Sequence, residues 1–138
     1  MDLYKEEVMD HYEHPRNQGE LSGDDVIYDR EVNASCGDSV QFYIRIAKSS
    51  DHSPKSAQGS ELRITEARWS GVGCAITTAS ASKLSEYLQG QTLQDIKSMS
   101  EEELSKKGIG FEVNPGRIKC LMLPIKVVKK ILTHTSKI

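Results

Sequence analysis

Three cysteines, far apart in a chain of 138 residues, are the side chains best suited to chemistry. The first, Cys36, lies in the segment Asn-Ala-Ser-Cys-Gly-Asp, so one glycine separates it from Asp38. Because glycine tolerates backbone conformations that other residues avoid, Gly37 permits a tight turn from which Cys36 and Asp38 point the same way. A thiolate beside a carboxylate suits a divalent metal of borderline softness, such as zinc or ferrous iron.

The other two cysteines each have a local reason to be anionic. Cys74 follows the segment Ser-Gly-Val-Gly and is expected at the start of a helix. The N-terminus of a helix stabilises negative charge, which lowers the pKa of a thiol placed there. Cys120 follows Arg117 and Lys119, and nearby cations also favour the thiolate. Three sulfurs and the Asp38 oxygen would make a four-coordinate set.

Other interpretations of these residues stay open at this point. Three unrelated free cysteines, buried as small hydrophobic side chains, are the plain alternative. A disulfide framework is disfavoured, because the number of cysteines is odd and no Cys-x-x-Cys occurs. His11 and His14 could share a metal on a helix face, but Pro15 should pull His14 out of the helix, which favours two surface histidines. A thiol hydrolase has no support, since no histidine lies in a recognisable nucleophile motif.

The elements that must position these residues begin with an N-terminal helix. Asp2 can cap it, and Pro15 should end it by forcing the preceding residue into an extended conformation. Tyr4, Val8 and Tyr12 recur at intervals of four and predict one apolar stripe.

Three strands are predicted next, over residues 27–33, 40–46 and 62–69. The second strand alternates most clearly between apolar and polar residues. In the third, the alternation breaks between Ile64 and Ala67, which indicates a bulge. The stretch 49–61 is rich in Ser, Gly and Pro and predicts a long exposed loop.

Helices are predicted after Gly73. The first covers 75–88, and Gly90 stands where a C-terminal glycine belongs. Thr92 begins a short helix, and Ser100 begins another that Lys106, Lys107 and Gly108 should close. One side of the last helix is apolar, and Pro124 should kink or split that helix. The apolar side consists of Ile118, Leu121, Met122, Ile125, Val128 and Leu132.

Strands that precede helices, at antiparallel hairpin spacing, predict an α+β fold. The length favours one domain over residues 1–138, with a modest core that a metal or partner would help to order. The net charge of −2 argues against a nucleic-acid-binding protein, although residues 116–138 carry six Lys or Arg and no acid. No apolar run is long enough for a membrane helix, and the N-terminus has no signal or transit pattern, so we expect a cytoplasmic protein.

Several segments together resemble a known family, the U-type iron–sulfur assembly proteins IscU, SufU and the N-terminal domain of NifU. Residues 8–18 resemble the opening helix with its His-Tyr…Pro-Arg-Asn signature, and 33–38 match the first ligand segment. Residues 64–80, which contain Cys74, resemble the second ligand segment, and 117–123, which contain Cys120, resemble the third. The resemblance runs from about Leu3 to Leu132.

This resemblance implies a SufE/NifU-like domain, a three-stranded antiparallel sheet packed by helices. Cys36, Asp38, Cys74 and Cys120 would converge at one exposed end and bind iron or a two-iron cluster. The implied partners are a cysteine desulfurase, which delivers sulfur as persulfide, and apo iron–sulfur proteins, which receive the cluster. Zinc is the metal expected in the purified protein.

The sequence departs from the family pattern at several places. IscU-type members carry a histidine before the third cysteine, whereas this chain has Lys119, a basic residue as in SufU. The spacing from Cys74 to Cys120 is nevertheless close to the shorter IscU spacing. The IscU chaperone-recognition motif aligns with residues 113–117 and keeps only Pro115 outright, which argues against a dedicated DnaK-type chaperone.

Two functions follow from the resemblance, and a third is the plain alternative. The first is a scaffold for cluster assembly, which is not an enzyme, and the second is a zinc-bound SufU-type sulfur carrier, a persulfide sulfurtransferase. The third is a small structural zinc module that binds a partner. Lys119 favours the carrier and the spacing favours the scaffold; on ligand chemistry we expect the scaffold.

Cys120 is the predicted sulfur-accepting thiol. Its flanking cations and its place at the start of the last helix favour an anion. Pro124 cannot donate the helical hydrogen bond to the Cys120 carbonyl, which should leave this segment room to move toward a desulfurase. Cys36, on its glycine-containing turn, is the competing candidate.

Overall fold

A computed structural model describes residues 3–33, 37–48, 62–111, 113, 116 and 118–135. Helix α1 (Leu3–Glu13) precedes strands β1 (Val26–Asn33), β2 (Asp38–Lys48) and β3 (Leu62–Val72). Helices α2 (Ala75–Leu88), α3 (Leu93–Ser98) and α4 (Glu101–Leu104), a π-helical turn η2 (Ser105–Ile109) and helix α5 (Ile118–Thr135) follow. The predicted α+β class is confirmed. The expected cap Asp2 and the expected loop over 49–61 lie outside the described residues.

The three strands form one antiparallel sheet in the order β1-β2-β3. β1 and β2 make a hairpin in which Asn33 pairs with Asp38. Asp38 is therefore the first residue of the central strand. The three-stranded antiparallel sheet expected from the family resemblance is confirmed.

One irregularity interrupts the pairing of β2 with β3. Consecutive residues of β2 pair with Glu66 and Ile64, so Thr65 is an extra residue on β3. This is the bulge that the broken alternation predicted, and it lets both halves of β3 keep their apolar side chains on the buried face.

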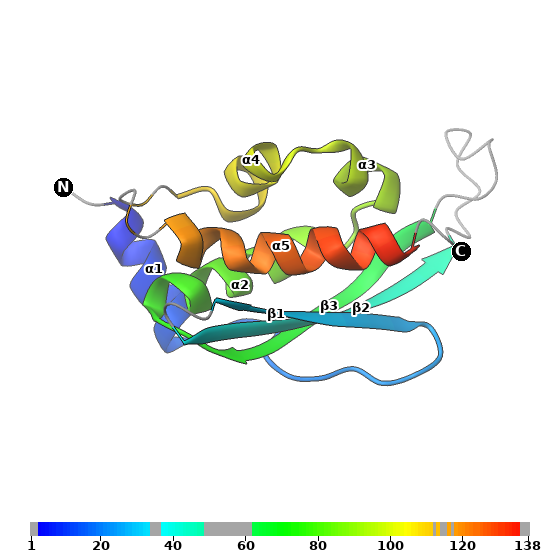
Figure 1. The fold of residues 1–138 in the computed structure, drawn as a ribbon, viewed down its shortest axis with the longest axis horizontal. Helices are drawn as coiled ribbons and strands as arrows, with labels where there is room; N and C mark the ends of the chain where they lie inside the picture. Colours follow the sequence, from blue (N-terminus) through cyan, green and yellow to red (C-terminus); the bar gives the residue numbers. More distant parts are fainter. Residues whose placement is uncertain are drawn as a thin grey trace.

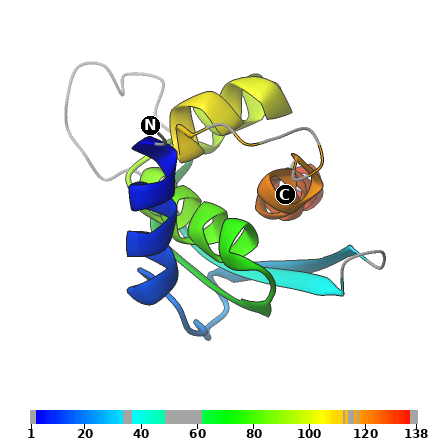
Figure 2. The ribbon, with the colours of Figure 1, turned by 90° about the vertical axis from the view of Figure 1, so that its left-hand side faces the viewer.

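Two helices cover one face of the sheet. α5 lies along β1 and β2, and α2 packs against both β3 and α5 (Figure 1). α1 packs against α2 at the side of the sheet (Figure 2). The core lies between these helices and the strands, where Val40, Phe42 and Ile44 of β2 are at most 1% exposed. Apolar side chains at alternate strand positions thus meet the apolar sides of α2 and α5.

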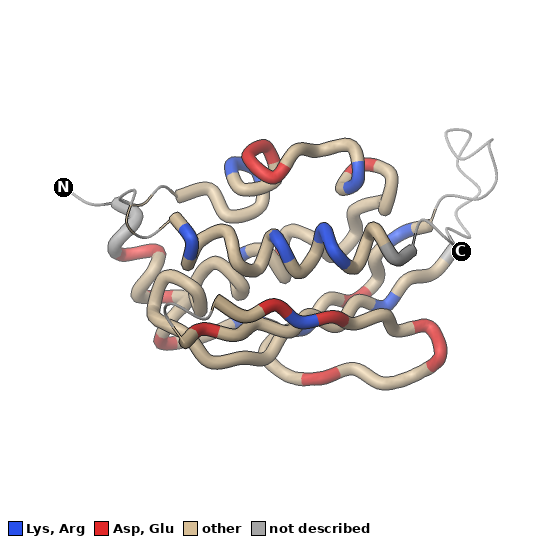
Figure 3. Tube along the Cα trace, in the orientation of Figure 1, with Lys and Arg blue, Asp and Glu red and all other residues tan. Residues whose placement is uncertain are grey.

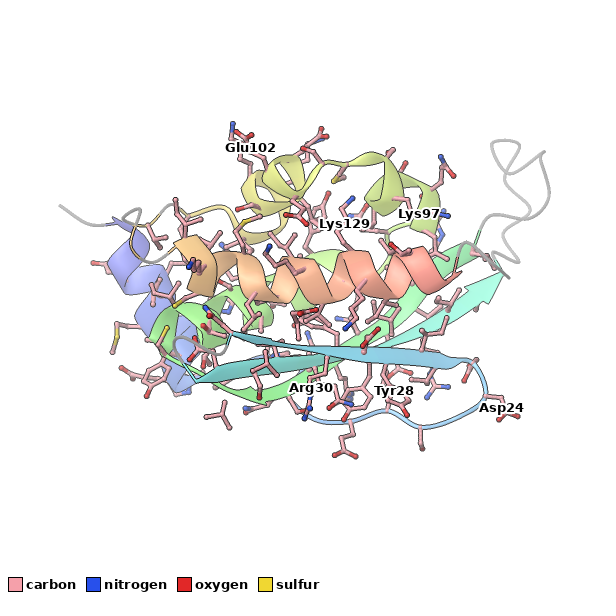
Figure 4. The ribbon with its side chains drawn as sticks, in the orientation of Figure 1. Asp24, Tyr28, Arg30, Lys97, Glu102 and Lys129 are labelled. Carbon is pink, nitrogen blue, oxygen red and sulfur yellow. The ribbon has the colours of Figure 1, made fainter. Side chains whose placement is uncertain are left out.

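The other face of the sheet carries polar and aromatic side chains. Tyr28 and Arg30 project from β1 away from α5 (Figure 4). The Tyr28 ring lies on Tyr43 of β2, with ring centroids 5.9 Å apart. This pattern of one buried and one open face agrees with the antiparallel topology.

Helix α1 ends at Glu13, before Pro15, as predicted. Its predicted apolar stripe is wrong, because Val8 is buried but Tyr12 is 47% exposed. The second inward position belongs to His11, whose Nδ1 is hydrogen-bonded to Ser82 Oγ of α2 at 2.7 Å. Burial of the ring and the nearby Arg16 lower the pKa of His11, which keeps it neutral. The prediction of two surface histidines therefore holds for His14 and fails for His11.

The segment that follows α1 is tied to α2 and β3. The Arg16 N–H donates to Ser82 Oγ at 2.9 Å, and the Arg16 carbonyl accepts from Nε1 of the buried Trp69 at 2.9 Å. The side-chain amide of Asn17 donates to Ser85 Oγ at 3.1 Å. The Pro-Arg-Asn segment therefore provides hydrogen-bond partners for the buried hydroxyls of Ser82 and Ser85 on α2, whereas Ser80 Oγ has none within the described residues.

Most predicted helix boundaries are confirmed. Gly90, with a φ of +92°, follows the end of α2. The Thr92 side chain accepts the Asp95 N–H, which makes it the cap of α3. Ser100 Oγ accepts the Glu103 N–H at 3.1 Å at the start of α4.

The end of α4 differs from the prediction. The helical conformation does not end at Gly108 but continues through the π-helical turn to Ile109. Gly110, with a φ of +83°, is the residue that ends it. The reason is packing against α2, since a Cβ at Gly108 would lie 2.9 Å from Leu84 Cδ1. Gly108 thus allows this turn to approach α2 closely, rather than closing the helix.

Helix α5 runs without interruption from Ile118 to Thr135, so Pro124 does not split it. Most of its predicted apolar side is buried, but Ile118 is 46% exposed. Within the described residues, α5 and the other helices include none that is long and apolar enough to cross a membrane.

Two lysines of the basic last helix make contacts within the domain. Lys129 Nζ reaches the carbonyl oxygens of Ile96, at 3.1 Å, and Met99 near the end of α3 (Figure 4). Lys130 Nζ lies 3.4 Å from carboxylates of Asp29 and Glu31 on β1. Figure 3 marks the basic positions along α5 and the acidic positions of the sheet below it. Two of the six basic residues in 116–138 are therefore held by contacts within this domain.

Substitution of Gly71 tests the close approach of β3 to β2. Gly71 has a φ of +154°, and a Cβ there would lie 2.2 Å from the Ser39 carbonyl oxygen. Gly71→Ala should lower the free energy of unfolding by about 3 kcal/mol, because backbone must move to admit the methyl group. Urea denaturation measures this change. Gly116→Ala is the control, since a Cβ there meets no atom of the described chain within 4 Å; equal stability of the two variants would contradict the prediction.

Candidate metal and sulfur site

Three of the four predicted ligands come together at one end of the sheet. Asp38 begins β2, Cys74 is the cap residue of α2, and Cys120 lies in the first turn of α5. A carboxylate oxygen of Asp38 and the two sulfur atoms all lie within 4.8 Å of one another. The fourth predicted ligand, Cys36, lies outside the described residues. Beside it, Gly37 has a φ of +72°, the tight-turn conformation that the sequence predicted.

Each of the three side chains is placed by an element that begins at the site. Pairing of Asn33 with Asp38 sets the first residue of β2, and the carboxyl group of Asp38 is on the helix-covered face at 4% exposure. Cys74 has an extended backbone, with a ψ of 175°, before α2 begins. Cys120 is 4% exposed beneath the first turn of α5. Packing of α2 and α5 on the same sheet therefore brings the three together.

The hydroxyl of Thr77 is a further polar group of this site, and the sequence reasoning missed it. Thr77 Oγ1 donates to Asp38 Oδ2 at 2.7 Å, and it lies 3.5 Å from Cys74 Sγ and 3.4 Å from the Cys120 carbonyl oxygen. The available signal was weak: a threonine of modest helix propensity, three residues after a cysteine, in a helix rich in Ser and Thr.

The two cysteines differ in their electrostatic environment. Burial acts to raise the pKa of Cys74, but hydrogen bonds from the N–H groups of Thr77 and Ile76 and from the Cys120 thiol outweigh it and lower that pKa. This agrees with the thiolate expected at a helix N-terminus. For Cys120, burial and the adjacent Cys74 sulfur raise the pKa to about 12.

The electrostatic reason given for Cys120 therefore fails in the metal-free protein. Lys119 is exposed, Arg117 lies outside the described residues, and Cys120 itself is buried beside a competing sulfur. Two thiols in contact share one favoured negative charge, and here Cys74 holds it because it caps a helix. The predicted contribution of the flanking cations is outweighed by burial.

The donor set fits a single divalent ion of borderline softness. In a tetrahedral site with zinc–sulfur bonds of about 2.3 Å, neighbouring sulfurs are about 3.8 Å apart. The observed upper limit of 4.8 Å between ligand atoms needs only a small closure to reach that geometry. A buried carboxylate beside two thiols is costly without a cation, which is a second indication that this cluster is built for a metal.

This small α+β domain, with two thiols and a carboxylate at one end of its sheet, matches a known family. The family model described as the NifU-like N terminal domain matches residues 3–137. The chain therefore belongs to the NifU-like N-terminal domain family, as the resemblance predicted.

Individual relatives agree with this assignment. The chain is 26% identical over 150 residues to the iron–sulfur cluster assembly scaffold protein IscU of Thermotoga maritima, covering 98% of this chain and 96% of the relative. It is 28% identical over 144 residues to the zinc-dependent sulfurtransferase SufU of Bacillus subtilis, covering 93% and 88%. The crystal structure of a NifU-like N-terminal protein from Brucella abortus superposes with a TM-score of 0.69 over 99% of this chain and 96% of that one. At 15% identity, that last likeness shows the fold.

The contrast between the two thiols predicts unequal reactivity. In the metal-free protein at neutral pH, iodoacetamide should modify Cys74 at least about tenfold faster than Cys120, because Cys74 is more accessible and more often a thiolate. Peptide mass spectrometry over a time course measures both rates in one sample. In urea the two rates should converge. A native Cys120 that reacts as fast as Cys74 would contradict the electrostatic assignment.

Proposed function

We propose that this protein is an iron–sulfur cluster assembly scaffold, which receives sulfur and holds iron or a two-iron cluster as cargo before passing it on. The single observation that carries the proposal is the convergence of the Asp38, Cys74 and Cys120 ligand atoms within 4.8 Å. Membership of the NifU-like family and the similarity to scaffold proteins named IscU support it. The whole chain from 1 to 138 would act as one domain in this role.

Cys36 is proposed as the fourth ligand. Asp38 is two residues further along the chain, so their α-carbons can be no more than about 7 Å apart. The Gly37 N–H donates to the Asn33 carbonyl at 2.9 Å, which fixes the end of the hairpin turn beside the site. With Cys36 the set would contain three thiolates and one carboxylate, a mixed set that holds iron or zinc less rigidly than four thiolates.

Two partners follow from this function. A cysteine desulfurase would supply sulfur as a persulfide, and apo iron–sulfur proteins would accept the finished cluster. Most of the segment that aligns with the IscU chaperone motif, including Pro115, lies outside the described residues. The argument against a dedicated DnaK-type chaperone therefore rests on the sequence alone.

A zinc-bound sulfur carrier is the second candidate, because Lys119 stands where IscU-type members have a histidine and a SufU sulfurtransferase is among the relatives. The two functions use the same ligands but different cargo. In the carrier, zinc would stay bound while a cysteine took sulfur from the desulfurase. Under this function the protein would be a sulfurtransferase; as a scaffold it would not be an enzyme.

Composition of the purified protein separates these functions. After anaerobic purification, the scaffold should take up iron and acid-labile sulfide in equal amounts when a desulfurase, cysteine, ferrous iron and a thiol reductant are supplied. The reductant provides the two electrons that convert each persulfide sulfur to sulfide. Cys74→Ser should lose this capacity, because a hydroxyl is a poor ligand for iron. Metal and sulfide assays, with visible absorption, measure the outcome. Stoichiometric zinc that resists exchange, with no labile sulfide, would contradict the scaffold and favour the carrier; no metal of either kind would contradict both.

Cys120 remains our proposed sulfur acceptor, and its support is positional. It lies at the start of α5. The Cys120 carbonyl lacks the usual helical hydrogen bond, because Pro124 has no N–H to donate. At 4% exposure, Cys120 could accept sulfur only if a desulfurase drew this first turn outward. Cys74 is the alternative that the structure adds, because its pKa is lowered and it is more accessible.

Mass spectrometry after incubation with a desulfurase and cysteine identifies the acceptor. The added sulfur should map to Cys120 and disappear in Cys120→Ser, while the Cys36→Ser and Cys74→Ser variants keep it. Persulfide found mainly on Cys74 or Cys36 would overturn the assignment and leave the family membership intact.

A further inference from the structure

Thr77 lies where the three elements of the site meet. Its side chain is 1% exposed, and its hydroxyl oxygen is 2.7 Å from Asp38 Oδ2, 3.5 Å from Cys74 Sγ and 3.4 Å from the Cys120 carbonyl. One buried hydroxyl thus touches the first residue of β2, the cap of α2 and the first turn of α5. A group with three such contacts is placed to control how they are arranged.

The single hydrogen of this hydroxyl goes to Asp38. A hydroxyl can donate only one hydrogen bond at a time, and the 2.7 Å contact to Asp38 Oδ2 has the ordinary length of an O–H···O bond. Cys74 Sγ, at 3.5 Å, and the Cys120 carbonyl oxygen, at 3.4 Å, are more distant competitors for the same hydrogen, so neither receives it while Asp38 does. Because a hydrogen bond to a carboxylate is stronger than one to a neutral acceptor, the distances and the chemistry agree.

The position of Thr77 is itself restricted. A Cβ on Gly73 would lie 2.8 Å from both Cβ and Cγ2 of Thr77 and 3.3 Å from Asp38 Cγ. Both side chains therefore pack closely against the Gly73 backbone. The branched side chain of threonine also has few χ1 choices within a helix. Glycine at position 73 therefore admits Thr77 and Asp38 together, and Thr77 has little freedom to turn away.

We infer that Thr77 is the positioning residue of the metal site, which holds Oδ2 of Asp38 and leaves the other carboxylate oxygen for the metal. This inference rests on the proposed function, since it assigns a role toward the metal that the site would bind. Partners that hydrogen-bond a ligating carboxylate fix its orientation, and their loss commonly weakens metal binding by about 10- to 100-fold. Thr77 also keeps a buried carboxylate hydrogen-bonded before any metal arrives.

Replacement of the hydroxyl by a methyl group tests this role. Thr77→Val keeps the shape of the side chain and should lower zinc affinity about tenfold in a competition with a chromophoric chelator, because Asp38 is then free to rotate. Thr77→Ser keeps the hydroxyl and should stay within about twofold of wild type. In the cobalt(II)-substituted protein, Thr77→Val should shift the visible absorption bands, which report the ligand set, and Thr77→Ser should not.

A double substitution separates positioning from a general structural effect. If Thr77 acts through Asp38, Thr77→Val should cause no further loss of zinc affinity in the Asp38→Ala background. Thr78→Val, the same change one residue further along α2, is the matched control and should leave affinity unchanged. An equal loss of affinity in both backgrounds, or no loss in Thr77→Val, overturns the inference while the metal site stands. A wild-type protein that binds neither zinc nor ferrous iron overturns the proposed function, and this inference with it.

Discussion

The packing of α2 against α5 on one face of the sheet is the interaction on which the rest of this structure depends. The sheet side of the contact is built from side chains that are almost fully excluded from water, such as Phe42, Ile44 and Ile64. Burial of that apolar surface drives the helices onto the strands. Since Cys74 caps one helix and Cys120 lies in the first turn of the other, the same packing that forms the core places both sulfurs beside Asp38. The core and the site are consequences of one arrangement.

That arrangement leaves polar groups at the end of an apolar core, where they are costly unless paired. Asp38 is 4% exposed and accepts a hydrogen bond from the Thr77 hydroxyl. The two thiols differ in acidity, because the pKa of Cys74 is lowered and that of Cys120 is raised to about 12. A cation would satisfy all three groups at once.

Helix α2 shows how the domain accepts weak local preferences for the sake of tertiary contacts. Serine and threonine are poor helix formers, because their hydroxyls compete for backbone hydrogen bonds. In α2 those hydroxyls serve other segments instead: Ser82 meets His11 and the Arg16 N–H, Ser85 meets Asn17, and Thr77 meets Asp38. The N-terminal segment and the candidate metal site are thus both hydrogen-bonded to polar side chains of α2.

Local patterns in the sequence determined the elements and the candidate ligands. Alternation revealed the strands and the bulge at Thr65, caps revealed the starts of α3 and α4, and the glycines beside Asp38 and Cys74 marked both as ligand candidates. These features depend on neighbours within a few residues, so the sequence displays them directly. Only the tertiary structure decided that His11 rather than Tyr12 turns inward, that burial outweighs the cations around Cys120, and that Thr77 holds Asp38. Each of these rests on contacts between distant segments, as across the 39 residues from Asp38 to Thr77, and the environment so created sets burial, pKa and orientation in ways that no local pattern records.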